Sequence, residues 1–78
     1  MTGPTVLLDC RGQLCPRPII ELARNLHRVE VGAVIGVAAD DVAARTDVPA
    51  WCRMREQEFL GAENAEDGVP VYLVRRLS

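Results

Sequence analysis

Long apolar runs are missing from this 78-residue sequence. No segment approaches the roughly 18 to 20 consecutive apolar residues that a membrane-spanning helix needs. Residues 1–4 also have neither the positively charged nor the apolar region of a signal peptide. We therefore expect a cytoplasmic protein that does not associate with a membrane.

A concentration of charge of one sign is also missing. The nine basic residues are all arginine, eleven acidic residues are spread along the chain, and the formal net charge is −2. A nucleic-acid-binding domain of this size would concentrate positive charge on one face. The charge pattern therefore argues against direct binding to DNA or RNA.

The cysteine and histidine residues lack the spacing of a metal site. Cys10, Cys15, Cys52 and His27 form no Cys-x-x-Cys pair and no histidine-containing cluster, which argues against zinc and against a thioredoxin-like centre. Three cysteines also cannot all pair within one chain, so a disulfide scaffold is not indicated. We expect reduced thiols and no metal.

One domain is expected to span residues 1–78, because a chain this short buries only about 60% of its extended-chain surface in a thin core. Apolar runs and turn residues predict a strand at 5–8, a helix after Cys15 that ends before Gly32, a strand at 33–39, a helix from Asp47 to about Gln57, and strands at 58–65 and 69–76. This order, β-α-β-α-β-β, predicts an α/β (α+β) two-layer sandwich with a four-stranded mixed sheet and two helices on one face.

The apolar spacing assigns a buried face to each helix. In the first helix we expect four buried residues, Ile19, Leu22, Ala23 and Leu26, opposite a mostly basic stripe of Arg17, Glu21, Arg24 and Arg28. In the second helix Asp47 is the expected N-cap and Pro49 lies in the first turn. Its expected apolar arc contains Val48, Trp51, Cys52 and Met54.

Cys15 is the residue most suited to chemistry. It begins the run Cys15-Pro16-Arg17-Pro18 at the predicted start of the first helix, where free N–H groups and the helix dipole favour an anion. A thiol in this setting commonly has its pKa lowered from about 8.5 to roughly 3.5 to 7.5. We therefore expect Cys15 to be a nucleophilic thiolate.

The neighbours of Cys15 suit that role. Arg11 and Arg17 would add positive potential, and Gly12 would leave the thiol open to approach. Pro16 suits the first helical position, and Pro16 and Pro18 together would hold the thiol outward.

The stretch from Leu8 to Pro18, LDCRGQLCPRP, resembles the signature of the TusA/SirA family of small sulfur carriers, which is Cys-Pro-x-Pro after an Asp-x-Arg/Leu-Gly turn. Asp40-Asp41 and the segments 47–52 and 72–76 also fall where the family has similar residues, so the resemblance covers almost the whole chain. One departure is Val42, where the family commonly has proline.

The resemblance implies the same two-layer fold and a sulfur-carrying function. Cys15 would accept a sulfane sulfur as a persulfide, with no other cofactor, and relay it between proteins. The donor would be a cysteine desulfurase or a rhodanese-type protein, and the acceptor would lead to tRNA thio-modification, cofactor assembly or sulfur oxidation. We expect the carrier to be a monomer.

Several residues keep alternative interpretations. Cys10 is either an inert core residue or a second thiol that pairs with an oxidised Cys15, which would make the protein a redox-responsive regulatory module. Arg24 and Arg28 form either a solvated face or a docking surface for acidic partners. We expect Asp40 and Asp41 to act as turn and helix caps rather than as acid–base residues, and Cys52 to pack in the core.

Overall fold

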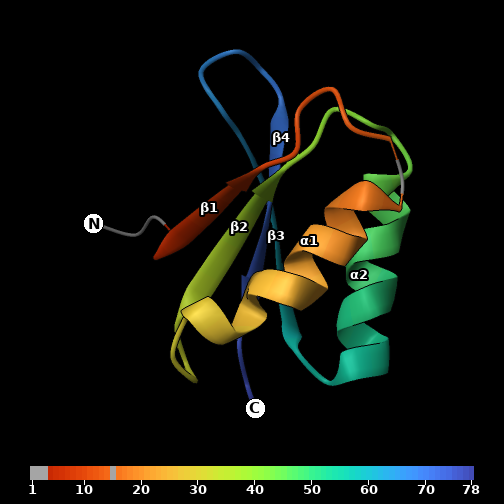
Figure 1. Ribbon diagram of the computed structural model, residues 1–78. Coiled ribbons are helices and arrows are strands. Elements are labelled where there is room, and N and C mark those ends of the chain that lie inside the picture. The colour runs from red at the N-terminus through yellow and green to blue at the C-terminus, as the bar shows by residue number, and fades with distance from the viewer. Residues whose placement is uncertain (1–3, 15) are drawn as a thin grey trace.

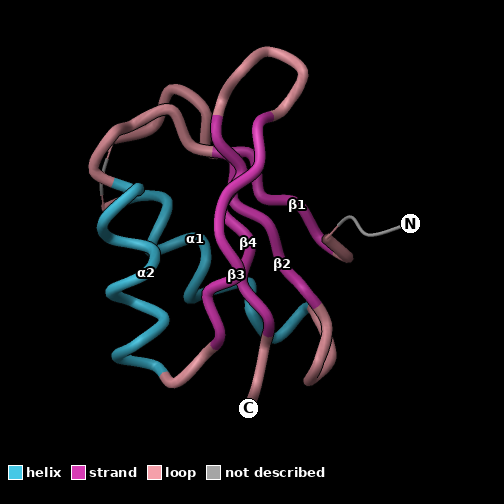
Figure 2. Tube along the Cα trace, turned by 180° about the vertical axis from the view of Figure 1, so that it is seen from behind, coloured by secondary structure: helices cyan, strands magenta, loops and turns pink. Residues whose placement is uncertain are grey.

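The computed structural model describes residues 4–14 and 16–78 (Figure 1). Its elements are β1 (Val6–Asp9), α1 (Arg17–Asn25) with a 3-10 turn (Leu26–Arg28), β2 (Val34–Ala38), α2 (Ala44–Arg55), β3 (Glu58–Asn64) and β4 (Pro70–Arg75). The sheet has the order β1-β2-β4-β3, in which β1 and β2 are parallel and the other neighbours antiparallel. Both helices lie on the same side of the sheet (Figures 1 and 2). The predicted two-layer fold with a mixed four-stranded sheet is confirmed.

The core lies between the sheet and the two helices. Val37 in β2 is in register with Leu8 of β1 and Tyr72 of β4, and all three side chains are buried. Leu22 of α1 and Val48 of α2 are fully buried in the same cluster. Since alternate residues of a strand face the same side, this pairing produces one continuous apolar surface for the helices to cover.

The second helix starts earlier than predicted. It begins at Ala44, so Asp47 is not the N-cap but lies in the first turn, and Pro49 is inside the helix. The N-cap residue is Ala43, and in the turn before the helix its N–H donates a hydrogen bond of 3.1 Å to Asp41 Oδ1. Asp47 still adds negative charge near the helix N-terminus, which the helix dipole favours.

Two residues predicted to be buried are exposed instead. Ala23 directly follows the buried Leu22 and is therefore turned about 100° away from it around the helix axis. Met54 of α2 is 73% exposed, because it lies beyond Trp51 on the outer side of the buried arc. The other predicted helix-face residues are buried or half-buried: Ile19, Leu22, Leu26, Val48, Trp51 and Cys52.

Three connections meet at one end of the sheet: residues 10–14 after β1, residues 39–43 after β2, and the turn between β3 and β4 (Figure 1). In that turn Gly68 has a φ of 85° and donates a hydrogen bond of 2.9 Å to the Ala65 carbonyl, so the predicted Asp67-Gly68 hairpin is present. The described chain contains no helix long and apolar enough to span a bilayer.

Candidate functional site

The candidate site surrounds the start of α1. Cys15 itself lies outside the described residues, so the structure defines its surroundings through its sequence neighbours. Leu14 precedes Cys15 and is 78% exposed, and Pro16 follows it and is also exposed. The chain on both sides of Cys15 is therefore at the surface of the protein.

The two prolines have different positions at the helix start. Pro16 is the N-cap residue rather than the first helical residue, and its carbonyl accepts a hydrogen bond of 2.9 Å from the Ile20 N–H. Pro18 is the second residue of α1 and is fully buried, so it anchors the helix start in the core.

The helix start also offers fewer free donors than an ordinary helix. Pro18 has no N–H, and the Arg17 N–H donates a hydrogen bond of 2.9 Å to the Leu14 carbonyl. Any stabilisation of an anion at this end must therefore depend more on the helix dipole and on nearby cations than on a ring of unpaired N–H groups.

Arg11 makes contacts that the sequence did not indicate. Its guanidinium Nε lies 2.8 Å from Asp67 Oδ2, and Nη1 lies 3.0 Å from Asp9 Oδ1. The hydrogen bonds from Arg11 lower the pKa of both carboxyl groups. Because two carboxylates compensate its charge, Arg11 contributes less to the potential around a thiolate than a free arginine would.

Gly12 adopts a left-handed backbone conformation and contacts the loop after β2. Its φ is 77°, and its N–H donates to both carboxylate oxygens of Asp40 at 3.0 and 3.1 Å. A Cβ at this position would meet no atom within 4 Å, so the space beside Gly12 is open. The two acidic residues after β2 thus differ in their contacts, since Asp41 accepts the Ala43 N–H in the turn before α2 while Asp40 holds the loop after β1.

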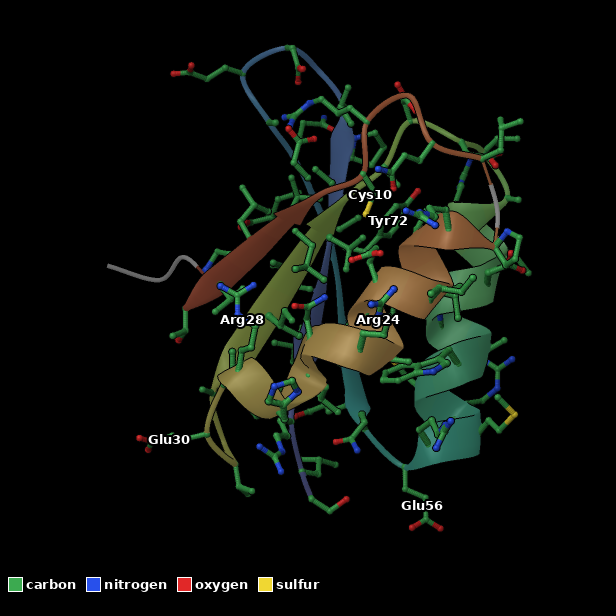
Figure 3. The ribbon with its side chains drawn as sticks, in the orientation of Figure 1. Cys10, Arg24, Arg28, Glu30, Glu56 and Tyr72 are labelled. Atoms are coloured by element: carbon green, nitrogen blue, oxygen red, sulfur yellow. The ribbon has the colours of Figure 1, made fainter. Side chains whose placement is uncertain are left out.

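The two described cysteines are both buried. Cys10 is 1% exposed and lies in the core cluster that includes Tyr72 (Figure 3), and burial raises its pKa. Cys52 packs in the same cluster, as predicted, and burial raises its pKa to about 11. Neither environment favours a thiolate, because desolvation penalises the charged form. The burial of Cys10 supports the inert interpretation of this residue.

The predicted basic stripe is exposed along α1 and the 3-10 turn. Arg24 and Arg28 are both exposed and are labelled in Figure 3. Arg28 donates a hydrogen bond of 3.2 Å to Asn25 Oδ1, and Arg17 lies 3.9 Å from Glu21 Oε2. The arginines therefore remain accessible at the surface, where a charged partner can meet them.

A shallow apolar groove of about 310 Å³ runs between the helices beside Pro16. Pro16 and Ile19 line it from the α1 side, and α2 contributes Asp47, Ala50, Trp51 and Met54. The described residues contain no group of three or more histidine, cysteine, aspartate or glutamate side chains placed to hold a metal ion. The site thus consists of a surface loop, a helix start and an open groove.

Sequence reasoning missed the contacts of Asp40 and Asp67 with the loop after β1. The Asp40 contact spans 28 positions and the Asp67 contact spans 56, so no local pattern indicates either of them. The only available signal was topological: loops that leave the same end of a sheet lie close together.

Comparison with known proteins identifies the family. Residues 6–76 match the family model described as sulfurtransferase TusA. Two proteins of Archaeoglobus fulgidus, both named "Putative sulfur carrier protein", are similar in sequence. One is 37% identical over 68 residues, which cover 87% of this chain and 88% of the relative. The other is 36% identical over 62 residues, which cover 80% of this chain and 85% of that relative.

A solved structure supports the fold independently. The crystal structure of a SirA-like protein from Desulfitobacterium hafniense matches with a TM-score of 0.79 and covers 95% of this chain and 100% of its own. At 21% identity this likeness concerns the fold alone. The family assignment depends on the sequence match, which spans β1 to the end of β4 and includes the segment with Cys15. The chain belongs to the sulfurtransferase TusA family.

Proposed function

We propose that the protein carries sulfane sulfur as a persulfide on Cys15 and passes it to a partner protein. The observation that carries this proposal is the family match over residues 6–76, together with the burial of the other two cysteines. Cys10 and Cys52 have raised pKa values in the core, so Cys15 is the one remaining candidate for the thiolate. The names of the two similar archaeal proteins support the same role.

The proposed transfer is an exchange between thiols without net oxidation. The Cys15 thiolate attacks the terminal sulfur of a donor persulfide, a new sulfur–sulfur bond forms at Cys15, and the donor leaves as a thiolate. In the second step an acceptor thiolate attacks the terminal sulfur of the Cys15 persulfide, and Cys15 returns to a thiolate. The sulfur is cargo on this chain rather than a resident cofactor.

The surface around the motif suits a protein partner better than a small molecule. The groove beside Pro16 is open, and Leu14 and Pro16 are exposed on either side of Cys15. An open surface lets the cysteine of a donor or acceptor protein approach, and both would be proteins of the cytoplasm in this proposal. Arg24 and Arg28 would attract an acidic surface on such a partner, and direct contact with nucleic acid is not part of the proposed role.

Intact-mass spectrometry tests the proposal. The wild type, Cys15→Ala and Cys10→Ser are each incubated with a persulfide-generating cysteine desulfurase and cysteine, and then measured with and without reductant. We expect one added sulfur in the wild type and in Cys10→Ser, reversed by reductant and absent from Cys15→Ala. Sulfur uptake by Cys15→Ala at the wild-type rate would refute the assignment. A disulfide between Cys10 and Cys15 in place of an added sulfur would support the redox-responsive alternative.

A further inference from the structure

The loop after β1 is held by carboxylates from two distant parts of the chain. Asp40, just beyond β2, accepts the Gly12 N–H with both carboxylate oxygens at 3.0 and 3.1 Å. Asp67, in the turn between β3 and β4, accepts Arg11 Nε at 2.8 Å and Arg11 Nη2 at 3.5 Å. These contacts act on adjacent residues of one short loop, which leads directly into the Cys15 motif.

Backbone hydrogen bonds hold the other described parts of the loop. Cys10 continues the sheet pairing through its N–H, which lies 2.8 Å from the Ala38 carbonyl, and the Gln13 N–H donates to the Cys10 carbonyl at 3.2 Å. Asp9, at the end of β1, also holds residue 11, since its Oδ1 accepts the Arg11 N–H at 3.2 Å and Arg11 Nη1 at 3.0 Å. Asp40 and Asp67 supply the long-range side-chain contacts, which fix residues 11 and 12 against the other two connections at this end of the sheet.

Hydrogen bonds also hold the segments that carry Asp40 and Asp67. Asp67 is held within its own turn by the Val69 N–H, which donates to Asp67 Oδ1 at 3.1 Å. Asp40 directly follows Ala39, which is buried and whose N–H donates to the Pro70 carbonyl at 3.1 Å. Each carboxylate thus belongs to a hydrogen-bonded segment next to the sheet. Hydrogen bonds to an ionised acceptor are also stronger than those between neutral groups.

We infer that Asp40 and Asp67 are positioning residues for Cys15: they fix the loop that delivers the thiol, Asp40 through the Gly12 N–H and Asp67 through Arg11. The inference rests on the proposed function, because it takes Cys15 as the reacting group. The Asp40 contact acts on the loop backbone directly, since it ends on a backbone N–H, whereas the Arg11–Asp67 contact acts through the arginine side chain.

Matched substitutions separate hydrogen bonding from charge. Asp40→Ala and Asp40→Asn both remove the negative charge, but only Asn retains an oxygen that can accept the Gly12 N–H. The ratio between these two variants therefore reports the hydrogen bond alone. For Asp67→Ala the matched control is Glu66→Ala, which removes the same charge from the neighbouring, exposed position of the same turn.

Two measurements are made on each folded variant. The first is hydrogen exchange of the Gly12 amide and of the Arg11 Nε–H by NMR. The second is the rate of Cys15 alkylation by iodoacetamide as a function of pH, located by peptide mass spectrometry. Neither needs a sulfur donor, so both remain informative if the protein carries no sulfur. The rate of sulfur uptake from the desulfurase is measured separately.

We expect Asp40→Ala to exchange the Gly12 amide about three- to tenfold faster than Asp40→Asn, and to take up sulfur more slowly by a similar factor. Asp67→Ala should accelerate exchange of the Arg11 Nε–H, with a smaller effect on uptake, while Glu66→Ala matches the wild type. Equal exchange and equal alkylation profiles in Asp40→Ala and Asp40→Asn would overturn the positioning role of Asp40. A match between Asp67→Ala and Glu66→Ala would overturn that of Asp67.

Discussion

The guanidinium of Arg76 donates a hydrogen bond of 2.7 Å from Nη1 to the carbonyl oxygen of Val29. Val29 is buried just after the 3-10 turn, and Arg76 directly follows β4, so this contact ties the connection between α1 and β2 to the end of the last strand. Two backbone bonds reinforce it: the Gly32 N–H donates to the Arg76 carbonyl at 2.6 Å, and the Arg76 N–H donates to the Ala33 carbonyl at 2.9 Å.

Replacing Arg76 should therefore destabilise the fold. We expect Arg76→Ala to lower the free energy of unfolding by about 1 to 3 kcal/mol, because it leaves a partly buried carbonyl without its charged donor. Urea unfolding followed by circular dichroism measures the change. The control is Arg75→Ala, which loses only an exposed pair with Glu58 and should stay within about 1 kcal/mol of the wild type. Equal losses in the two variants would contradict the role of the Val29 contact.

The contacts of Arg11 predict an acid-sensitive contribution to stability. Hydrogen bonds from Arg11 hold the pKa values of Asp9 and Asp67 below their ordinary value of 3.8 in the folded protein. A carboxyl group whose pKa is lower in the folded than in the unfolded protein stabilises the fold at pH values above its unfolded pKa. That stabilisation is lost as the pH falls through the pKa of the folded protein. The contribution is therefore complete at neutral pH, begins to fall near the unfolded pKa of about 4, and is lost once the pH is below the folded pKa values.

Arg11→Met tests this pH dependence. Melting temperatures of the wild type and the variant are compared between pH 7 and pH 2.5. We expect the difference between them to be greatest at neutral pH and to shrink as the two carboxyl groups are protonated. A difference that stays constant over this range would show that the Arg11 contacts do not act through the charges of Asp9 and Asp67.

The end of α2 offers a stabilising substitution. Glu56 directly follows α2 (Figure 3). It has a φ of 60°, a left-handed conformation that glycine adopts without strain. We expect Glu56→Gly to raise the free energy of unfolding by about 0.5 to 1 kcal/mol, as measured by urea unfolding. Glu56→Ala is the control, because it removes the charge and keeps the Cβ. If the Ala variant gained as much stability as the Gly variant, charge rather than backbone strain would explain the effect.

The three thiols should differ sharply in reactivity. Cys10 and Cys52 are buried, and burial raises both pKa values, that of Cys52 to about 11. In the native protein at pH 7.5 we expect rapid alkylation of Cys15 only, and comparable labelling of all three cysteines after unfolding. Time-resolved alkylation with peptide mapping makes this measurement. Rapid labelling of Cys10 in the native state would contradict its buried environment.

The arginines of α1 should affect the encounter with a partner rather than the fold. We expect Arg24→Glu combined with Arg28→Glu to slow sulfur transfer from a donor protein about tenfold or more at low ionic strength, with a smaller effect in high salt. The control is Arg53→Glu combined with Arg55→Glu, which makes the same change in net charge at two exposed positions of α2. Stopped-flow mixing with a labelled donor separates association from the chemical step. Equal slowing by the control would point to net charge rather than to a specific surface.

Much of the fold was predictable because its signals are local. The Asp67-Gly68 turn and the apolar run of β2 each specify an element within a few residues, and the order of the elements then limits the architecture. The start of α2 was misplaced because Asp47 has the side chain of a typical cap, whereas the actual N-cap is Ala43, which makes no side-chain cap hydrogen bond and so leaves no signal in the sequence.

The site was less predictable for a different reason. The sequence identified Cys15 and its neighbours from one motif, but the sign and spacing of charges could not show that Arg11 is compensated by two carboxylates. Nor could they show that Pro18 is buried while Pro16 is exposed. These properties depend on which loops share one end of the sheet, and that is a consequence of the assembled fold.

The position of β4 has a consequence for how the protein is made. Although β4 is the last strand in the chain, it lies between β2 and β3 and pairs with both. Until residues 70–75 have left the ribosome, only the β1–β2 pair of the final sheet can form, and two strands alone are marginally stable at best. The sheet, and with it the contact between Asp67 and Arg11, is therefore completed only after β4 has been synthesised, and nascent chains that lack β4 should be inert.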